Sequence, residues 1–261
     1  MTYVYLWVLV LGLITAMMTV LWVVSVFIRN VSIVDIFWGF GFVAVTFLCF
    51  FLTEGEGIRK SLALILVTVW GLRLTLYIAW RNMGKEEDFR YRSFRQKYGE
   101  NRYWWISFFQ VFLLQGVLMW LVCAPLVGTQ MKHGHQPLNL FDYTGMIVWL
   151  TGFIFEAGGD LQLALFKSNP ANRGKILDKG FWRYTRHPNY FGDAAVWWSF
   201  GLFSIGAGYY FPALGSILMT FIIFRVSGVT LLDKSLTEKK EGYADYIRRT
   251  SPFIPWFPKD K

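Results

Sequence analysis

The sequence predicts an all-α, polytopic membrane protein with seven transmembrane helices, and three observations support this class. Hydrophobic residues fill 55 % of the 261 positions and charged residues only 16 %, whereas about 25 % of an average soluble domain is charged. Several uncharged runs reach the length of about 20 residues that a helix needs to cross a bilayer. The basic residues behind the net charge of +9 gather between alternate runs. This composition excludes a disordered chain and argues against a soluble enzyme.

Seven apolar segments follow one another along the chain. Their approximate ranges are 4–28, 31–53, 60–80, 104–127, 142–166, 189–206 and 209–230. The first is taken as a span because its first basic residue, Arg29, follows the apolar run, whereas a signal peptide has basic residues before it. The last two divide one uncharged stretch that is too long for a single crossing, and Pro212 with its neighbouring glycines marks the break.

The basic residues predict the orientation of these spans. With the N-terminus outside, 21 of the 26 lysines and arginines lie on the cytoplasmic side, as the positive-inside rule requires. The distribution of charge therefore predicts a multi-pass membrane protein, and the bacterial inner membrane is the expected location. The net positive charge is explained by topology, so no nucleic-acid partner is predicted. The chain is predicted to be one membrane-embedded domain, 1–261, whose tail 231–261 begins as an amphipathic helix at the cytoplasmic face.

We expect no catalytic or binding site at two short motifs or at the two cysteines. Gly39-x-Gly41-x-x-Ala44 fits a dinucleotide-binding fingerprint, but it lies inside an apolar span with no strand before it. These small residues are expected to allow close helix packing instead. His133 and His135 have no third ligand nearby, so no metal site is predicted. Both cysteines lie in apolar runs, which excludes a disulfide framework.

Ionisable residues inside the predicted spans point to a polar site. They are Asp35, Arg73, Glu156, Asp160, Asp193 and Arg225. Each would cost roughly 2.5–3.5 kcal/mol near the bilayer centre if it were unpaired, so these groups either form internal salt bridges or line a polar cavity.

Helical spacing favours the cavity. Trp70, Arg73 and Tyr77 share one helix face. Asp160 with Lys167, and Asn189 with Asp193, form two more polar stripes, and Gln115 lies in the middle of the fourth span.

The segment 180–193, GFWRYTRHPNYFGD, predicts an anion site where a helix begins. Arg186 and His187 precede Pro188, which suits the first turn of a helix. A helix N-terminus flanked by arginine binds anions. The loop before it adds further donors, namely Lys167, Asn172, Arg173, Lys175 and Lys179. A phosphate-bearing cofactor and anionic lipid headgroups both fit this loop.

The order of these motifs resembles that of the steroid 5α-reductase family, in a short bacterial form. The matching segments are Arg73-x-x-x-Tyr77, Leu114-Gln115-Gly116, Asp160 with Lys167, Gly180-x-x-x-Tyr184, Arg186-His187-Pro188-Asn189-Tyr190-x-Gly192-Asp193 and the ending 246–255. The wider superfamily includes sterol C14 reductases and isoprenylcysteine carboxyl methyltransferases. The reductases use NADPH and the methyltransferases use S-adenosylmethionine. Asp35 matches the family's catalytic glutamate, and Trp70 stands at the position of its catalytic tyrosine.

The resemblance implies an NADPH-dependent 3-oxo-5α-steroid 4-dehydrogenase-like oxidoreductase, which reduces the Δ4 C=C bond of a 3-oxo steroid or a similar enone lipid. Asp35 would assist at the ketone oxygen as a neutral acid, with Trp70 as the second catalytic residue. The implied cofactor-binding residues are Arg73, Tyr77, Gln115, Asp160, Lys167, Asn172, Arg173, Lys175, Tyr184, Arg186, His187, Asn189, Asp193 and Arg225. The apolar substrate would enter from the bilayer, and no obligate protein partner is inferred.

Two other functions are weighed against this one. A methyltransferase that uses S-adenosylmethionine could be built on the same Arg186–Asn189 segment, although the basic loop offers more anion-binding groups than a cofactor without phosphates needs. A transporter would use the buried charges as a translocation path, but the sequence shows no paired discontinuous helices in two halves.

Overall fold

The structure confirms the all-helical class. The computed structural model describes residues 2–54, 57–131, 137–225, 237, 240 and 242–259, and over those ranges it contains helices and no strand. The contacts divide the chain into two compact units. Unit 1 comprises Met1–Asn139 and Phe203–Gly215, and unit 2 comprises Leu140–Leu202 and Ser216–Lys261. Each unit is described by itself.

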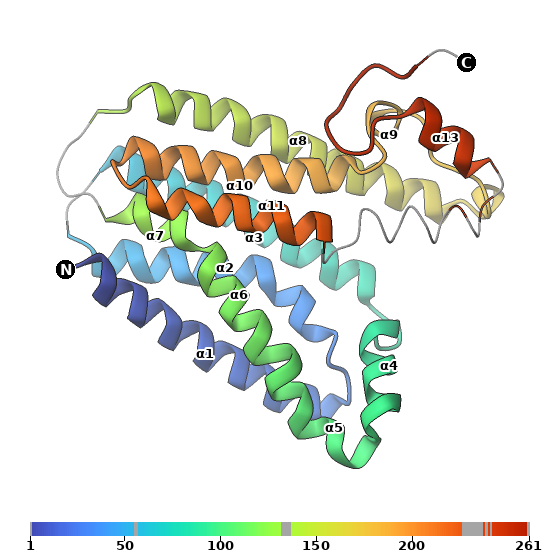
Figure 1. Cartoon of the computed structure of the whole chain (residues 1–261), viewed down its shortest axis with the longest axis horizontal. Coiled ribbons are helices and arrows are strands. Elements are labelled where there is room, and N and C mark those ends of the chain that lie inside the picture. Colours follow the sequence, from blue (N-terminus) through green and yellow to red (C-terminus); the bar gives the residue numbers. More distant parts are fainter. Residues whose placement is uncertain are drawn as a thin grey trace. The chain divides into compact units, whose positions relative to one another are not determined.

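Unit 1 holds four helical stretches that are long and apolar enough to cross a membrane. They are α1 (Tyr3–Ile28), α2 (Ile33–Leu52), α3 (Ile58–Asn82) and the continuous stretch Glu100–Val122. α1 packs against α2, and α2 against α3 (Figure 1). The predicted spans 4–28, 31–53 and 60–80 are therefore confirmed as helices, with ends that differ by at most two residues.

Two glycines let α2 and α3 approach closely. A Cβ atom added at Gly39 would lie 2.3 Å from the carbonyl oxygen of Gly71, and one added at Gly71 would lie 2.6 Å from that of Gly39. Close backbone contact of this kind is how small residues hold helices together in a membrane, where the hydrophobic effect between helices is absent. The packing role expected for Gly39 is confirmed.

The predicted fourth span, 104–127, needs a correction at its end. α5 (Glu100–Ser107), the π-helical segment η1 (Phe108–Leu113) and α6 (Leu114–Val122) follow without a break. Cys123 ends this stretch, and α7 (Ala124–Gln130) starts anew with a proline in its first turn. A proline ring clashes with the preceding turn and lacks an N–H, so the helix stops five residues earlier than predicted.

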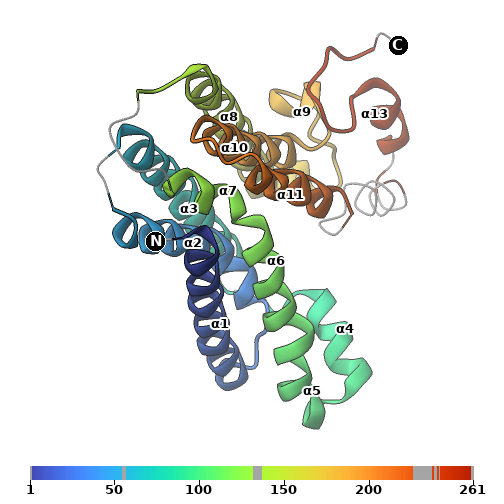
Figure 2. The ribbon, with the colours of Figure 1, turned by 60° about the vertical axis from the view of Figure 1, so that its left-hand side comes forward.

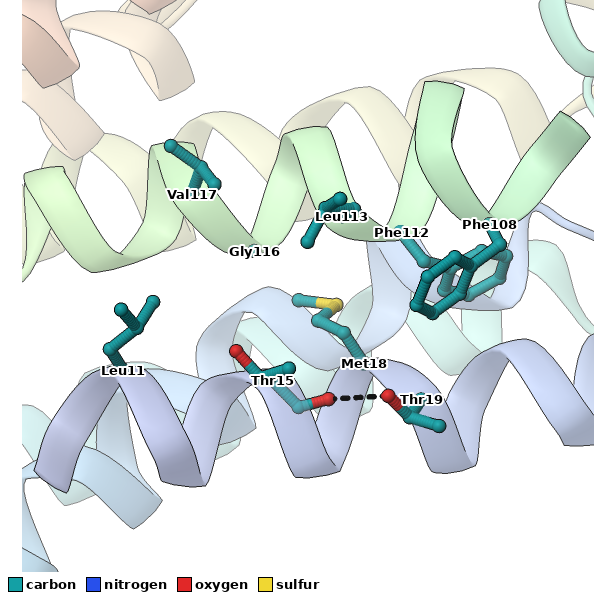
Figure 3. Close-up of a pocket in the computed structure, with 9 residues that line it drawn as sticks. All are labelled: Leu11, Thr15, Met18, Thr19, Phe108, Phe112, Leu113, Gly116 and Val117. Carbon is teal, nitrogen blue, oxygen red and sulfur yellow. Dashed lines mark hydrogen bonds between the residues drawn. The ribbon is translucent and has the colours of Figure 1, made fainter.

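The contact of η1 and α6 with α1 leaves only a small gap. Met18 and Thr15 of α1 face Phe112 and Gly116 across it, and Thr19 donates to the Thr15 carbonyl oxygen (Figure 3). The cavity measures about 10 Å³, which is room for about one water molecule. It is a packing defect beside the π-helical turn.

A short helix that the sequence does not predict lies in the basic segment 81–103. α4 (Phe89–Tyr98) begins after Asp88, whose carboxylate caps it by accepting from the Arg90 N–H at 2.9 Å. The buried Glu87 accepts from the Val31 N–H at 2.8 Å and from the Arg95 guanidinium at 2.9 Å. These bonds fix α4 against the turn between α1 and α2, and they determine where its side chains lie.

Unit 2 is built on α8 (Leu140–Ser168), with most of α10 (Pro188–Gly206) and most of α11 (Leu214–Arg225). The three helices run side by side in both ribbon views (Figure 2). Gly152 and Gly192 allow the contact of α8 with α10, since a Cβ atom at Gly192 would lie 2.3 Å from the Glu156 nitrogen. The predicted segments 142–166 and 189–206 are thus confirmed as helices.

The last predicted span, 209–230, begins later than expected. Pro212 lies in a 3₁₀ turn, η3 (Phe211–Ala213), and α11 starts after it at Leu214. Residues 226–230, and with them 231–236 of the predicted tail helix, lie outside the described residues. In the described part of the tail, α13 (Tyr243–Arg249) forms a helix within the predicted amphipathic segment.

The C-terminal segment runs beside the residues that precede α10. Thr185 forms an isolated parallel bridge with Ser251, and the Arg186 N–H donates to the Ser251 carbonyl oxygen at 2.9 Å. The Trp256 N–H donates to the Tyr184 carbonyl oxygen, also at 2.9 Å. This pairing holds α13 near α9 (Phe181–Tyr184) within unit 2 (Figure 1).

Candidate functional site

A connected polar network in unit 1 centres on Asp35, near the start of α2. One carboxylate oxygen accepts from the Tyr91 hydroxyl at 2.7 Å, and the other accepts from the Arg90 guanidinium at 2.9 Å. The Tyr91 oxygen accepts from Gln115 Nε2 at 3.0 Å, and Gln115 Oε1 accepts from the Trp38 indole at 2.6 Å. The network therefore joins α2, α4 and α6.

Both oxygens of Asp35 have hydrogen-bond partners, and one of these partners is a guanidinium. The role of Asp35 as a neutral acid that donates stays a prediction. The Tyr91 hydroxyl, which is hydrogen-bonded to Asp35, is a second proton-bearing group in this network. Burial and the adjacent Asp35 carboxylate raise the pKa of Tyr91 above its usual value, so this hydroxyl stays protonated at neutral pH.

Three predicted site residues of α3 differ in their contacts, namely Trp70, Arg73 and Tyr77. Trp70 is fully buried, with its ring 6.1 Å from that of Phe42. Arg73 lies over the Tyr77 ring at 5.7 Å, and Arg81 lies over the same ring at 5.9 Å. The contact of Arg73 with the Tyr77 ring agrees with their predicted place on one helix face, and the Trp70 ring contacts α2 through Phe42.

Sequence reasoning missed Tyr91 and Arg90. Both lie in a basic segment that the positive-inside rule explains as a topology signal. The available signal was the helix start at Asp88, which places a tyrosine in the first turn of a short helix. Nothing in the sequence shows which span that helix faces.

A pocket of about 400 Å³ lies in unit 2, within the range of roughly 300–1,000 Å³ that ligand sites occupy. It brings together five residues that the sequence analysis assigns to a cofactor. These are Lys167, Asn172, Arg173, Arg186 and His187. Lys240 and the aromatic side chains of Trp182, Tyr243 and Tyr246 join them, although the sequence analysis did not assign these four to a cofactor.

The pocket is cationic with an apolar wall. Lys167, Arg173, Arg186 and Lys240 line it, and no carboxylate does so among the described residues. Leu163, Phe166, Ile176 and Leu177 supply apolar surface. Such a lining suits an anion that also carries a flat or apolar group, because the cations attract the charge and the rings cover the remainder.

Arg186 also holds one side of this pocket in place. Its Nη1 donates to the carbonyl oxygens of Ile247 at 3.0 Å and of Thr250 at 2.8 Å, at the end of α13. The neighbouring Thr185 hydroxyl donates to the Phe253 carbonyl oxygen at 2.7 Å. These bonds position α13, and with it Tyr243 and Tyr246, as one side of the pocket.

Other predicted cofactor residues lie in unit 2 without being part of the pocket lining. Asn189 Nδ2 donates to Asp160 Oδ1 at 3.1 Å, which joins α10 to α8. Asp193 is half-buried one turn along α10. The remaining three, Lys175, Tyr184 and Arg225, are exposed.

Lys175 nonetheless helps to define one edge of the pocket. Its carbonyl oxygen accepts from the side chain of Lys240 at 2.6 Å, and this bond joins the loop before α9 to the chain before α13.

No metal centre is found in the part of the chain that the structure describes. No group of three or more histidine, cysteine, aspartate or glutamate side chains gathers there. His133 and His135 lie outside the described residues. Both cysteines are buried and free of disulfides, as their positions in apolar runs predict.

Comparison with known proteins gives one family and several relatives. Residues 21–250 match the family described as "Protein of unknown function (DUF1295)". The uncharacterized protein C594.04c of Schizosaccharomyces pombe is 26 % identical over 90 % of this chain and 76 % of its own length. No solved structure matches the chain.

Two relatives are enzymes. The probable O-methyltransferase ustE of Ustilaginoidea virens is 32 % identical over 52 % of this chain and 45 % of its own length. The Delta(14)-sterol reductase of Arabidopsis thaliana is 29 % identical over 42 % of this chain and 31 % of its own length. The chain thus matches less than half the length of either enzyme.

Proposed function

The chain belongs to the DUF1295 family, and from that premise we propose that it is an NADPH-dependent membrane reductase of an activated C=C bond. The proposed substrate class is a 3-oxo-Δ4 steroid or a similar enone lipid that enters from the bilayer. The observation that carries the proposal is the pocket of unit 2, where four cations meet an aromatic wall. The similarity to a sterol reductase supports the same reaction type.

The pocket suits a phosphate-bearing dinucleotide. Lys167, Arg173 and Lys240 would meet phosphates, since all three are cations that line the pocket. Trp182, Tyr243 and Tyr246 offer ring faces to a base. A reduced nicotinamide supplies a hydride when it is bound. Asp160, Asn189 and Asp193 would accept and donate hydrogen bonds at the ribose and the amide.

The network of unit 1 is assigned to the substrate carbonyl. When a hydride reaches the β-carbon of an enone, negative charge develops on the ketone oxygen, and a donor placed there lowers the barrier. Tyr91 and Arg90 are donors held on the Asp35 carboxylate. Asp35 itself would assist at the ketone oxygen as a neutral acid, as the resemblance implies. Trp70 can donate through its indole N–H but cannot transfer a proton.

The proposal includes the membrane topology. Four helices are long and apolar enough to span, and α8, α10 and α11 would supply three more. Seven spans put the basic segments on one side, with the N-terminus outside and the C-terminus in the cytoplasm. The pocket loop 167–187 would then open to the cytoplasm, where NADPH is available. In a bacterium the membrane would be the inner one.

The relative ustE favours a second candidate, an O-methyltransferase that uses S-adenosylmethionine. This cofactor carries a sulfonium, an ammonium and a carboxylate group, so its net charge is positive, and it has no phosphate. Four cations in one pocket would attract its carboxylate alone and would oppose its net charge. The charge of the described lining therefore favours the reductase.

One experiment separates the two candidates. The purified protein in detergent is given NADPH and progesterone, and the absorbance of the reduced nicotinamide and the steroid product are followed. We expect NADPH oxidation and a 5α-dihydro product. Retention of radiolabelled S-adenosylmethionine, with no binding of NADPH, would replace the reductase by the methyltransferase.

The role of Asp35 has its own test. We expect Asp35→Asn to lower turnover on the order of 10²-fold with little change in NADPH affinity, because the carboxyl group proposed to act at the ketone oxygen is lost while the pocket of unit 2 is untouched. Full activity in Asp35→Asn would remove this residue from the mechanism.

A further inference from the structure

The segment 251–258 of unit 2 contains three prolines and is held in place by its backbone. The Arg186 N–H donates to the Ser251 carbonyl oxygen at 2.9 Å. The Trp256 N–H donates to the Tyr184 carbonyl oxygen, also at 2.9 Å. Both partners lie in the few residues between α9 and α10 (Figure 1). The segment therefore follows a definite course beside the start of α10.

Phe253, inside this segment, packs against two helices. Its ring centroid lies 6.0 Å from that of Phe191 in α10 and 4.3 Å from that of Phe224 in α11. Because α10 begins at Pro188 and α11 ends at Arg225, these contacts place the segment where one helix begins and the other ends. In the proposed topology both helices are spans, and this end of them lies at the cytoplasmic face.

Three neighbours of Phe253 expose large apolar side chains, and we call Ile254, Trp256 and Phe257 the outer patch. They are 66 %, 70 % and 75 % exposed, respectively. The Phe257 ring lies 6.4 Å from that of Trp256 and 6.1 Å from that of Tyr184. Exposed apolar side chains on a backbone that hydrogen bonds hold in place favour an apolar medium over water.

Cations flank the outer patch. Arg183 is exposed next to Tyr184, and Lys259 is exposed two residues after Phe257. Tryptophan rings beside basic side chains are typical of the boundary between hydrocarbon and headgroups, where the rings lie at headgroup depth and the cations meet anionic lipid. This chemistry, at the end of two proposed spans, favours a lipid surface as the partner of the patch.

We propose that the outer patch is a membrane-interface anchor that holds a wall of the unit 2 pocket in place. Trp256 and Phe257 enter the headgroup region of the bilayer, and Arg183 and Lys259 bind anionic lipid headgroups. The inference rests on the topology within the proposed function, and it adds the lipid surface as a partner of the site.

Hydrogen bonds join the anchor to the pocket wall. The Lys259 N–H donates to the Arg249 carbonyl oxygen at 3.0 Å, at the end of α13. The Thr185 hydroxyl donates to the Phe253 carbonyl oxygen at 2.7 Å, just before α10. α13 carries Tyr246, which lines the pocket. A segment that lipid holds in place therefore also holds α13 and this tyrosine.

Fluorescence quenching tests the contact with lipid. Phe257→Cys and Ala244→Cys, the latter at an exposed position of α13 outside the patch, are labelled with bimane in the full chain. The wild-type chain gives the background from the buried Cys49 and Cys123. In nanodiscs of phosphatidylcholine and phosphatidylglycerol, we expect spin-labelled lipid to quench the probe at 257 and iodide to quench the probe at 244.

Two results would overturn the anchor. One is that iodide quenches both probes equally, which would place the patch in water. The other is that unlabelled Phe257→Cys forms disulfides between copies in vesicles, which would assign the patch to a second copy of the chain.

Limited proteolysis tests the link to α13. The double variant Trp256→Ser/Phe257→Ser is compared with Leu161→Ser, which changes an exposed apolar residue of α8 outside the segment. In the same nanodiscs, we expect trypsin to cut after Arg248 about 10-fold faster in the double variant, because cleavage follows the population in which α13 is released. Leu161→Ser should be cut like wild type. Wild type should be cut faster when phosphatidylglycerol is left out.

Wild-type cleavage in the double variant would overturn the link between the anchor and the pocket wall. Cleavage of wild type that does not depend on phosphatidylglycerol would overturn the roles of Arg183 and Lys259. Neither measurement needs turnover, so if wild type oxidises no NADPH with any enone, the reductase function falls and these results stand.

Discussion

The guanidinium of Arg186 donates a hydrogen bond to the carbonyl oxygen of Thr250 at 2.8 Å, and so joins the start of α10 to the end of α13. Arg186 also lines the cationic pocket of unit 2. The residue predicted to meet a phosphate is thus also the one that holds a wall of the pocket in place, and a change at Arg186 acts in two ways.

We expect Arg186→Ala to lower the free energy of unfolding by about 1–3 kcal/mol, because two carbonyl oxygens at the end of α13 lose their donor. Denaturation in detergent measures this loss, and trypsin should cut faster after Arg248 and Arg249. Arg183→Ala, at an exposed arginine outside the pocket lining, is the control. A stability equal to that of wild type would mean that Arg186 does not hold α13.

Arg173→Ala tests the pocket with less effect on the fold. Arg173 is exposed on the loop after α8 and lines the pocket. Removing one charge-assisted phosphate contact should weaken NADPH binding by about 10-fold or more, since such bonds contribute about 1.5–3 kcal/mol. Calorimetry or fluorescence of the reduced nicotinamide gives the affinity. Arg183→Ala should bind like wild type, and equal losses in both variants would point to general charge attraction.

The preference for NADPH over NADH gives a further test of Arg186. If its side chain meets the phosphate that distinguishes NADPH from NADH, Arg186→Ala should weaken NADPH binding more than NADH binding. Equal losses for the two dinucleotides would assign Arg186 to the wall of the pocket alone. The measurement is the ratio of the two dissociation constants in each variant.

Gly39→Ala tests the contact between α2 and α3. The added Cβ atom would meet the Gly71 carbonyl oxygen at 2.3 Å, so the backbones must separate. We expect a loss of about 1–3 kcal/mol in stability. Gly12→Ala in α1 is the matched control, because a Cβ atom there has nothing within 4 Å. Thermal unfolding in detergent should separate the two variants, and equal melting temperatures would contradict the close approach.

The helix cap of α4 predicts a pH dependence. Burial opposes ionisation of Asp88, but hydrogen bonds from the Arg90 side chain and backbone outweigh it and lower the pKa of Asp88 below its usual value. Because the pKa is lower in the folded state, this stabilisation is complete above the unfolded value of about 3.9 and is lost as the pH falls through the folded value. Asp88→Asn should flatten the decline of stability below about pH 4, measured by unfolding at several pH values.

The sequence alone determined the helical class and located most of the cations that line one pocket. Apolar runs as long as a bilayer crossing can satisfy their backbone groups as helices, so α1, α2 and α3 follow from composition, although α2 carries Asp35 and α3 carries Arg73. The cations around α9 and the start of α10 were found from spacing, because a helix start flanked by basic residues binds anions wherever it occurs. Five of the residues named on that ground line the pocket of unit 2.

Only the tertiary structure decided which partners these residues have. Tyr91 is 56 positions from Asp35 along the chain, and Thr250 is 64 positions from Arg186. Contacts over such separations depend on how helices pack, and helical periodicity gives the face of a residue but not what it meets. For the same reason the sequence could not show that Tyr243 and Tyr246 would complete the pocket, or that Asp35 would accept hydrogen bonds on both oxygens.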